Sequence, residues 1–346
     1  MRFYQPQTTF YCGVDLHTRN MYPTVMSKDC EVLFHRKMPN DPKLFLRILA
    51  PYRESVVVSC ESTTNWYWLA DLCAAEEIEF VLGHALYMRA IHGTKSKNDR
   101  IDSEKIARLT AGGLLPQAYA YPRAQRSLRD LLRRRLKLVR RRAELFAHVK
   151  AVNSQYNLPS LGSELQYVSG RVNVAERFED PYARRSVEAD LELIDDYTPL
   201  IRSVEKTVEQ AARDVYPQEC VILQSIPGVG KIICLTILLE IDQITRFPTR
   251  QKFCSYCRLV HPRGESDGKL YGTQGRKQGN PYLKWAFSEA AVCSATHCLP
   301  IKKRLQRLEQ KYGPGKGKSI LAHKLGRSVY HMLLHQRVFD LEKFLR

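Results

Sequence analysis

The first hundred residues alternate between short apolar runs of strand length and stretches with the spacing of amphipathic helices. The expected strands are 9–16, 21–27, 30–38, 55–61 and 78–82, and the expected helices between them are 41–52 and 66–76. The alternating residues of the second and third runs favour antiparallel pairing, whereas the continuous apolar run 55–61 is typical of a strand buried on both faces. This pattern predicts an α/β domain, in which helices cover a central sheet.

Acidic residues stand where these strands end. Asp15 closes the first strand and Glu61 closes the apolar strand 55–61. Asp99 and Asp102 lie three residues apart at the start of a further helical stretch, a spacing that places both on one helix face. Ligands of α/β sheets gather at the carboxyl ends of strands. Four carboxylates in this order are suited to hold two divalent cations for phosphoryl transfer, although an acidic first helix turn on its own is common.

The charge of the chain points to a polyanionic partner. Lysine and arginine number 54 against 36 acids, which gives a formal net charge of +18. Such an excess favours nucleic acid as the partner. Around the acidic pair stand Lys95, Lys97 and Arg100, which are expected to hold a nucleic-acid strand beside the carboxylates. No long uncharged apolar run and no apolar leader are found, so we expect a cytoplasmic protein and not one that acts at a membrane.

The ten cysteines are scattered, without the spacing of a small disulfide scaffold. Cys254 and Cys257 form a C-x-x-C pair, but no second half of a zinc finger follows at the usual distance. We therefore expect reduced, buried thiols in this part of the chain.

Glycine and proline residues at 112–123 interrupt the pattern, and a long helix is expected over 125–156. Its apolar positions step by four and three residues, as in a coiled-coil seam. The seam positions are Leu132, Leu136, Val139, Ala143 and Phe146. Six arginines occupy the ten residues 133–142, and few acids lie nearby. Phosphates are the expected counterions, with a solvated helix face as the alternative. The candidates are Arg133, Arg134, Arg140 and Arg141.

A second helix is expected over 183–215, and Pro199 is expected to kink or interrupt it. This stretch is rich in acids near its start, so it can pair antiparallel with the basic helix or with another subunit. The sequence leaves both possibilities open.

The segment 226–231, IPGVGK, is flanked by apolar helical sequence and is typical of a helix-hairpin-helix element. Gly228 and Gly230 would let backbone N–H groups approach a DNA phosphate, with Lys231 adding charge. Such an element holds the DNA backbone without reading bases. An ordinary tight turn between two helices is the alternative.

The motifs GVDLH near the start, CEST after the strand 55–61, and KSKNDRIDSEKIA around Asp99 resemble those of the DEDD transposases of insertion sequences. That family is related to the Piv-type invertases and includes recombinases guided by a bridge RNA. The resemblance implies an RNase H/RuvC-like fold whose four acids bind Mg²⁺. Motif by motif, these acids are Asp15, Glu61, Asp99 and Asp102.

The resemblance also implies a nucleophilic serine in a loop near the other end of the chain, and it falls on Ser266. This chain departs from the family pattern in having Asp267 where glycine is usual, and Arg258 where glycine follows Tyr-Cys. Arg276 and Lys277 follow in the same segment and are suited to neutralise a phosphorane. In the family the middle helical segment is a coiled coil that joins subunits and binds RNA.

The sequence therefore predicts three parts. Residues 1–120 form an α/β RNase H/RuvC-like domain, 121–215 a helical coiled-coil segment for assembly and RNA binding, and 216–346 a mainly α-helical domain with a helix-hairpin-helix element and the serine loop. The expected protein is a transposase guided by a bridge RNA, acting on target and donor DNA through a covalent phosphoserine as a dimer or tetramer. The alternatives are a RuvC-like, metal-dependent nuclease of the junction-resolvase type and a non-catalytic RNA-binding protein.

Overall fold

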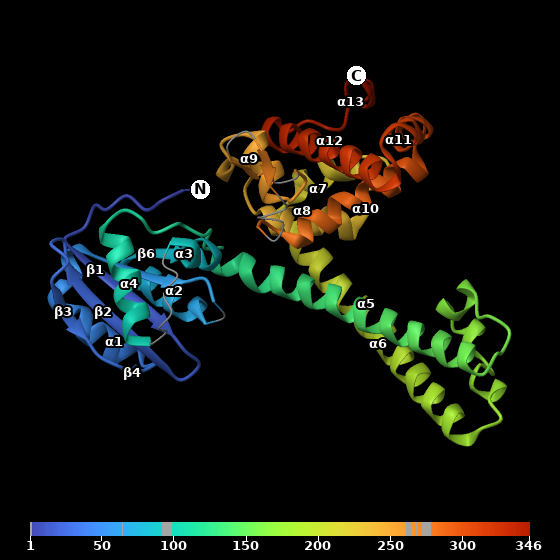
Figure 1. Ribbon diagram of the computed structural model, residues 1–346, viewed down its shortest axis with the longest axis horizontal. Coiled ribbons are helices and arrows are strands. Elements are labelled where there is room, and N and C mark those ends of the chain that lie inside the picture. The colour runs from blue at the N-terminus through green and yellow to red at the C-terminus, as the bar shows by residue number, and fades with distance from the viewer. Residues whose placement is uncertain (1, 64, 92–98, 261–263, 267–268, 272–277) are drawn as a thin grey trace. The chain divides into compact units, whose positions relative to one another are not determined.

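The computed structural model describes residues 2–63, 65–91, 99–260, 264–266, 269–271 and 278–346. The chain divides into two compact units, Met1–Arg123 and Ala124–Arg346 (Figure 1). The finer division of the second unit near residue 215 stays a prediction.

The first unit is a mixed sheet with helices on both faces. Its strands are β1 (Phe10–Leu16), β2 (Asn20–Ser27), β3 (Val32–His35), β4 (Met38–Pro39), β5 (Val56–Glu61) and β6 (Glu79–Gly83). Its helices are α1 (Pro42–Leu49), the 3₁₀ helix η1 (Ala50–Ser55), α2 (Trp66–Ala75), α3 (Ala85–Ile91) and α4 (Asp99–Ala111). The strand order is β3-β2-β1-β5-β6, with β4 paired to β2. Strands β1, β2 and β3 pair antiparallel, whereas β1, β5 and β6 run parallel, which fits the predicted RNase H/RuvC-like fold.

Successive residues of β1 enter different cores because side chains alternate along a strand. Cys12 and Val14 are buried with residues of α1 and α2. Tyr11 is buried on the opposite face, where it packs in one cluster with Ile106 of α4. The sheet thus has a hydrophobic core on each face, and α4 belongs to the second.

The second unit is mostly helical. Its long helices are α5 (Arg123–Gln155), which begins at the last residue of the first unit, and α6 (Pro181–Val215). The 3₁₀ helices η2 (Ser163–Gln166), η3 (Ser169–Arg171) and η4 (Ala175–Arg177) connect them. The remaining elements are α7 (Pro217–Gln224), α8 (Lys231–Ile241), η5 (Ile244–Arg246), α9 (Arg250–Tyr256), β7 (Gly264–Ser266), β8 (Lys269–Tyr271), α10 (Pro281–His297), α11 (Leu299–Tyr312), α12 (Pro314–His335) and α13 (Leu341–Leu345).

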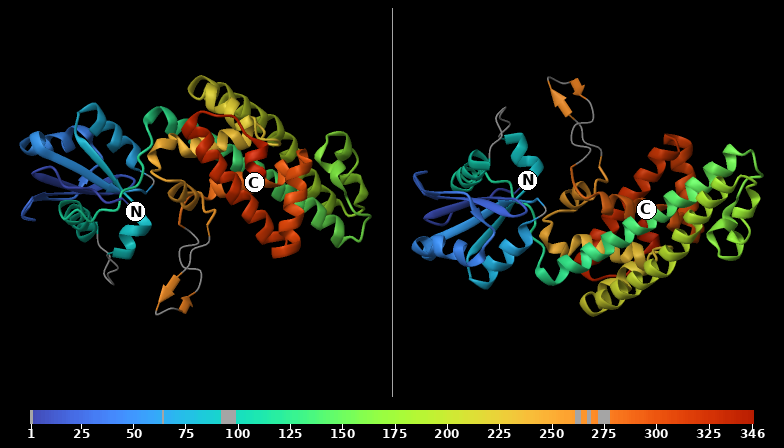
Figure 2. Two further views of the ribbon diagram at one scale, coloured as in Figure 1. Left: turned by 90° about the horizontal axis from the view of Figure 1, so that it is seen from above. Right: turned by 90° about the horizontal axis from the view of Figure 1, so that it is seen from below.

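Helices α5 and α6 pair antiparallel within the chain, as Figure 2 shows for the green and yellow helices. Arg135 of α5 donates to Glu205 of α6, with an Nε–Oε1 distance of 2.7 Å. Further along, Arg142 donates to the hydroxyl of Thr198 at 3.1 Å. The sequence leaves open whether the acidic helix pairs with the basic helix or with another subunit. These contacts show that α6 pairs with α5 of the same chain. Coiled-coil packing and a role in subunit contacts stay predictions.

Two details of this pair differ from the sequence prediction. Helix α6 continues through Pro199, so the expected interruption there is wrong. Leu132 and Leu136 are buried as the predicted seam requires, but Ala143 is exposed. Helix α6 instead meets α5 partly through arginine, since the side chain of Arg135 is only 14% exposed. An acid on the facing helix makes that burial possible.

Helix α8 is the centre of the second unit, because every residue from Ile233 to Ile241 is buried. It packs against α7 and α10. Cys254 and Cys257 lie in the same core as free thiols. Burial raises the pKa of Cys254 to about 11 and also raises the pKa of Cys257 well above its ordinary value. Both therefore stay protonated near neutral pH. In the described part of the chain, no helix combines the length and apolar character needed to cross a bilayer.

Candidate functional site

Asp15 and Glu61 lie side by side at the carboxyl edge of the sheet. Val14 pairs with Cys60 in the parallel ladder of β1 and β5, so the residues that follow them occupy adjoining positions. Asp15 is the next-to-last residue of β1 and its side chain is 18% exposed, whereas Glu61 ends β5. The sheet register thus brings together the two strand-borne acids that the sequence singles out.

Helix α4 reaches this edge because Gly13 lets it approach the sheet closely. A Cβ atom at Gly13 would lie 2.4 Å from the backbone oxygen of Ser103 and 2.3 Å from the nitrogen of Ala107. No real Cβ tolerates such distances, so only glycine allows α4 to lie where it does. Asp102 comes directly before Ser103, and Gly13 lies two residues before Asp15. The first turns of α4 therefore sit on β1 close to its carboxyl end.

Hydroxyl groups fix α4 along one row of the sheet. Ser103 and Thr24 share a hydrogen bond of 2.8 Å between their side-chain oxygens, and both residues are fully buried. Near the other end of α4, Thr110 and Ser59 make an equivalent bond of 2.8 Å. Thr24 and Ser59 are the neighbours of Gly13 in the two adjoining strands. Along this row, α4 therefore packs closely against one glycine and forms hydrogen bonds with the hydroxyl groups on either side of it.

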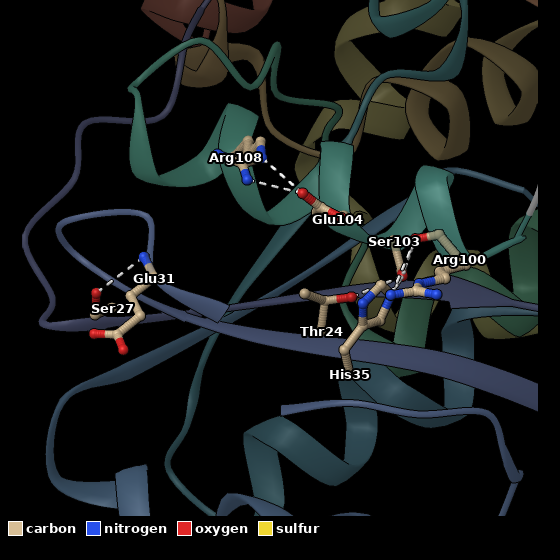
Figure 3. Close-up of polar contacts among 8 residues, drawn as sticks. All are labelled: Thr24, Ser27, Glu31, His35, Arg100, Ser103, Glu104 and Arg108. Atoms are coloured by element: carbon tan, nitrogen blue, oxygen red, sulfur yellow. Dashed lines mark hydrogen bonds and ion pairs between the residues drawn. The ribbon is translucent and has the colours of Figure 1, made fainter. Parts of the chain in front are cut away.

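His35 of β3 extends this row toward the start of α4 (Figure 3). Its Nε2 atom lies 3.1 Å from the backbone oxygen of Arg100, and the hydroxyl of Ser103 donates to the same oxygen at 3.1 Å. Burial lowers the pKa of His35, although its contact with the Arg100 carbonyl acts in the opposite direction. Thr24, Ser103 and His35 do not stand out in the sequence, because single polar residues within strand or helix patterns look solvent-facing. The sequence signal for this row is a small residue at matching positions of three neighbouring strands.

Two of the described carboxylates at this edge contact basic side chains. His17 Nε2 lies 3.2 Å from Oδ2 of Asp15, and Lys105 Nζ lies 3.5 Å from Oδ1 of Asp102. Carboxylate oxygens are the donors that Mg²⁺ prefers. Among the described side chains, however, no three His, Cys, Asp or Glu residues lie close enough together to hold a metal ion. The side chain of Asp99 lies outside the described part, so the convergence of all four acids stays a prediction.

The basic residues expected beside these acids are described only in part. Lys95 and Lys97 lie outside the described residues. Arg100 is exposed on the first turn of α4. Their contact with a nucleic-acid strand stays a prediction.

The arginines of α5 divide into two groups. Arg133 faces the core, where it donates to both carboxylate oxygens of Glu240 at 2.6 and 2.8 Å. Arg134 and Arg140 are exposed. Arg141 is also exposed and lies 2.9 Å from Glu144 on the same helix. The protein itself therefore supplies the counterion of Arg133, whereas phosphate contacts of the outward arginines stay a prediction.

The two glycines between α7 and α8 have different surroundings. Gly228 has a positive φ of 79°, and a Cβ there would lie 2.4 Å from the backbone oxygen of Cys293 in α10. Among the described residues, no atom is found within 4 Å of a Cβ built at Gly230, which precedes the first turn of α8 without a side-chain cap. Lys231 is exposed and lies 2.7 Å from Glu209. Gly228 thus permits packing, and Gly230 is the residue that leaves the helix start open.

Ser266 ends β7, which pairs antiparallel with β8 and places Ser266 opposite Lys269. The side chain of Ser266 lies outside the described part, as do Arg276 and Lys277 entirely. Both ends of this segment belong to the helical core of the second unit. Arg258 donates from Nε to the backbone oxygen of Gly279 at 2.8 Å, which joins one end to the other.

Comparisons with known proteins match both units. A family model for DEDD transposases, described as a transposase, matches residues 12–157, which include the four acids. The model of the transposase IS116/IS110/IS902 family matches residues 220–307, from α7 to α11. The transposase for insertion sequence element IS1111A of Coxiella burnetii is 24% identical over 260 residues, which cover 70% of this chain and 68% of that protein.

The mixed sheet with its edge of acids and these matches define a DEDD transposase, a class of enzymes that cut and rejoin DNA. Within that class, the chain belongs to the IS110 family of insertion-sequence transposases. The family resemblance found in the sequence is thereby confirmed.

Proposed function

We propose that this transposase is guided by a bridge RNA and joins DNA through a covalent phosphoserine at Ser266. One observation carries the proposal: the two family models fall separately on the parts of the chain that hold the expected chemistry. Residues 12–157 contain the acids at the sheet edge, and residues 220–307 contain the serine segment. Each part contributes what the other lacks, a set of carboxylates and a hydroxyl.

In the proposed step, the Oγ atom of Ser266 attacks a DNA phosphorus. The Oγ–P bond forms as the bond from phosphorus to a deoxyribose oxygen breaks, and the serine proton passes to a base while the leaving oxygen takes up a proton. Return of a deoxyribose hydroxyl to the phosphoserine reverses the reaction on a new strand. The two P–O bonds exchange one for one, so strand joining needs no external energy source.

Asp15, Glu61, Asp99 and Asp102 are the residues that would hold Mg²⁺, because hard carboxylate oxygens suit it. When bound, Mg²⁺ would stabilise the negative charge that develops on the scissile phosphate. His17 and Lys105 now contact two of these carboxylates. We expect both side chains to turn toward the DNA phosphates when the carboxylates take up the cation.

The proposed grip on nucleic acid uses both ends of the chain. Lys95, Lys97 and Arg100 would hold the strand at the sheet edge, and Arg276 and Lys277 would hold it at the serine segment. The outward arginines of α5 would bind guide RNA, while the open start of α8 would contact the DNA backbone. These candidates on α5 and α8 are Arg134, Arg140, Arg141, Gly230 and Lys231. We further propose that the α5–α6 pair joins subunits into a dimer or tetramer, which works in the cytoplasm at the nucleoid.

The covalent step is tested by trapping a protein–DNA adduct. Purified protein with its co-purified RNA is incubated with labelled DNA that matches the RNA loops, quenched in denaturant and separated by size. The proposal expects an adduct that Ser266→Ala abolishes and that Ser288→Ala, at an exposed serine of α10, leaves intact. Cutting that persists in Ser266→Ala without an adduct would mean instead that water attacks, as in a RuvC-like nuclease.

The role of the acids is tested in the same assay. Asp15→Asn and Asp102→Asn should each lower the rate of adduct formation by at least about a hundredfold, the scale of losing a group that stabilises developing charge. Asp29→Asn, in the exposed turn between β2 and β3, is the matched control and should have no effect. A wild-type protein that forms no adduct and cuts no DNA, with RNA binding unchanged in all three variants, would favour a non-catalytic RNA-binding protein.

A further inference from the structure

A single carboxylate interrupts the most apolar helix of the second unit. Glu240 lies in the last turn of α8, where its neighbours from Ile233 to Ile241 are all buried, and it is itself 1% exposed. Burying an ionised carboxylate costs several kcal/mol unless cations and hydrogen bonds compensate it. A leucine would serve the core better, so the partners of Glu240 show what the carboxylate does.

Two arginines of α5 neutralise Glu240. Arg133 binds it through two hydrogen bonds of 2.6 and 2.8 Å, and Arg129 donates from Nε at 3.1 Å. Burial by itself would raise the pKa of Glu240, but the two arginines and the amide of Asn280 outweigh it and lower the pKa. The guanidinium of Arg133 also stacks on the ring of Tyr282, 4.4 Å from its centre. The carboxylate is therefore ionised and held from one side by α5.

The third partner of Glu240 stands at the end of the serine segment. Asn280 donates from Nδ2 to Oε2 of Glu240 at 2.7 Å. Its Oδ1 atom caps α10 by accepting from the backbone nitrogens of Tyr282 and Leu283, and its own backbone nitrogen donates to the oxygen of Tyr256 at 2.6 Å. Asn280 is 4% exposed. One residue thus joins the start of α10 and the carboxylate on α8 through its side chain, and the end of α9 through its backbone nitrogen.

The opposite end of the segment is fixed at the same place. Arg258 directly follows α9 and its C-cap residue, and it reaches across to the backbone oxygen of Gly279. Gly279 has a φ of 92°, and a Cβ there would lie 2.5 Å from the oxygen of Tyr256. Residues 259–278, which contain Ser266, therefore leave and re-enter the core through one small cluster of hydrogen bonds.

We propose that Glu240 is a positioning residue for the Ser266 segment: it ties Asn280, where the segment re-enters the core, to Arg129 and Arg133 of α5. The role rests on the proposed function only in naming Ser266 as the reacting group. The tie sets the two ends of the segment relative to the helix whose outward arginines face solvent. A nucleic acid bound along α5 and the serine that acts on DNA would then both be positioned by the same group of packed helices.

Amide hydrogen exchange of the full-length protein tests the tie without using activity. The variants are Glu240→Gln, which removes the charge, and Asn280→Ser, which keeps a helix-capping hydroxyl but loses the amide donor. Glu205→Gln is the matched control, because it breaks the pair with Arg135 on the same α5 and touches neither end of the segment. We expect exchange of the amides of 256–259 and of 279–283, apart from Pro281, which has none, to rise about tenfold in the first two variants and to stay unchanged in the control. The proposal would be overturned if these amides exchanged at the same rate in all three variants.

A triple variant separates positioning from plain stability. Replacing a buried ionic cluster by apolar residues of similar size often restores or raises stability. Arg129→Met, Arg133→Met and Glu240→Leu together should therefore fold with the wild-type melting temperature, yet keep the fast exchange at 256–259 and 279–283. Exchange that returns to the wild-type rate would show that the cluster only stabilises the core.

The adduct assay then connects the tie to the reaction. Asn280→Ser should lower the rate of adduct formation at saturating DNA about tenfold while leaving the DNA affinity unchanged. A loss of affinity with an unchanged rate at saturation would contradict positioning. If Ser266→Ala still forms the adduct, the proposed nucleophile is wrong, whereas the exchange experiment still decides whether Glu240 ties the segment.

Discussion

Thr24 of β2 and Ser103 of α4 are joined by a hydrogen bond of 2.8 Å between hydroxyls that are both completely buried. Ser103 directly follows Asp102, so this bond fixes the helix at the residue next to an expected metal ligand. Removal of the Ser103 hydroxyl takes from Thr24 the hydrogen bond that its buried hydroxyl makes, which costs more than the net value of the bond, whereas Ser103 keeps its bond to the Arg100 carbonyl when Thr24 is replaced. The pair therefore stabilises the first unit and also fixes the position of Asp102 relative to the sheet.

We expect Ser103→Ala and Thr24→Val each to lower the free energy of unfolding by about 1–3 kcal/mol. The double variant should lose less than the sum, because no hydroxyl is left without its partner. Urea unfolding of the single and double variants measures this coupling. Ser27→Ala, which removes an acceptor of backbone N–H groups in an exposed turn (Figure 3), should cost less than about 1 kcal/mol. Additive losses at Thr24 and Ser103 would show that the two hydroxyls do not depend on each other.

Acid should weaken the first unit through His35. Burial lowers its pKa below the ordinary value of 6.5, so the unfolded chain binds a proton more readily than the folded one. The stability contributed by neutral His35 is full above about pH 6.5, the unfolded value, and is lost as the pH falls through the lowered folded pKa. Urea unfolding between pH 7.5 and 5 should show a smaller decline in His35→Gln than in the wild type. A decline of the same size in both would place the acid sensitivity elsewhere.

Inward and outward arginines of α5 should separate stability from binding. Arg133→Ala leaves Glu240 with less compensation and should cost about 3 kcal/mol of unfolding free energy. Arg134→Ala and Arg140→Ala should change stability by less than about 0.5 kcal/mol, but each should reduce the salt dependence of nucleic-acid binding by about one counterion. Unfolding in urea and filter binding at several salt concentrations provide the two measurements. Outward variants with an unchanged salt slope would exclude this face as a phosphate contact.

The turn before α8 offers a matched pair of glycines. Gly228→Ala adds a methyl group against the Cys293 carbonyl at a positive φ, and should cost about 3 kcal/mol. Gly230→Ala meets no atom within 4 Å and should cost less than about 1 kcal/mol. If a DNA phosphate approaches the start of α8, Gly230→Ala should still weaken duplex binding severalfold. Melting temperature and duplex affinity of the two variants are the measurements, and an unchanged affinity in Gly230→Ala would remove this turn from the DNA interface.

The strands of the first unit could be predicted because their patterns are local. Asp15 and Glu61 could be predicted to be neighbours, because each closes a predicted strand. The parallel register of β1 and β5 confirms that they lie side by side. The bonding of α4 to Thr24 and Ser59 could not be predicted, because it depends on residues some 80 and 50 positions away from their partners.

The arginines of α5 show the same limit. Periodicity predicts which face of the helix is apolar, but not that Arg133 and Arg135 turn inward. Their burial depends on Glu240 and Glu205, acids that lie 107 and 70 residues further along the chain. At Pro199 the structure differs from the sequence prediction for another reason. Packing against α5 keeps α6 continuous, although proline on its own favours a break in the helix.

The cluster around Glu240 restricts how this part of the family can diverge. Loss of the acid would remove the carboxylate that both arginines and the amide of Asn280 share, and loss of either arginine would remove a cation that compensates the buried acid. Substitution one residue at a time therefore passes through unstable intermediates. Homologous transposases should keep this group of side chains together or exchange it as a whole for apolar ones, a covariation between α5, α8 and the N-cap residue of α10 that sequence surveys can look for.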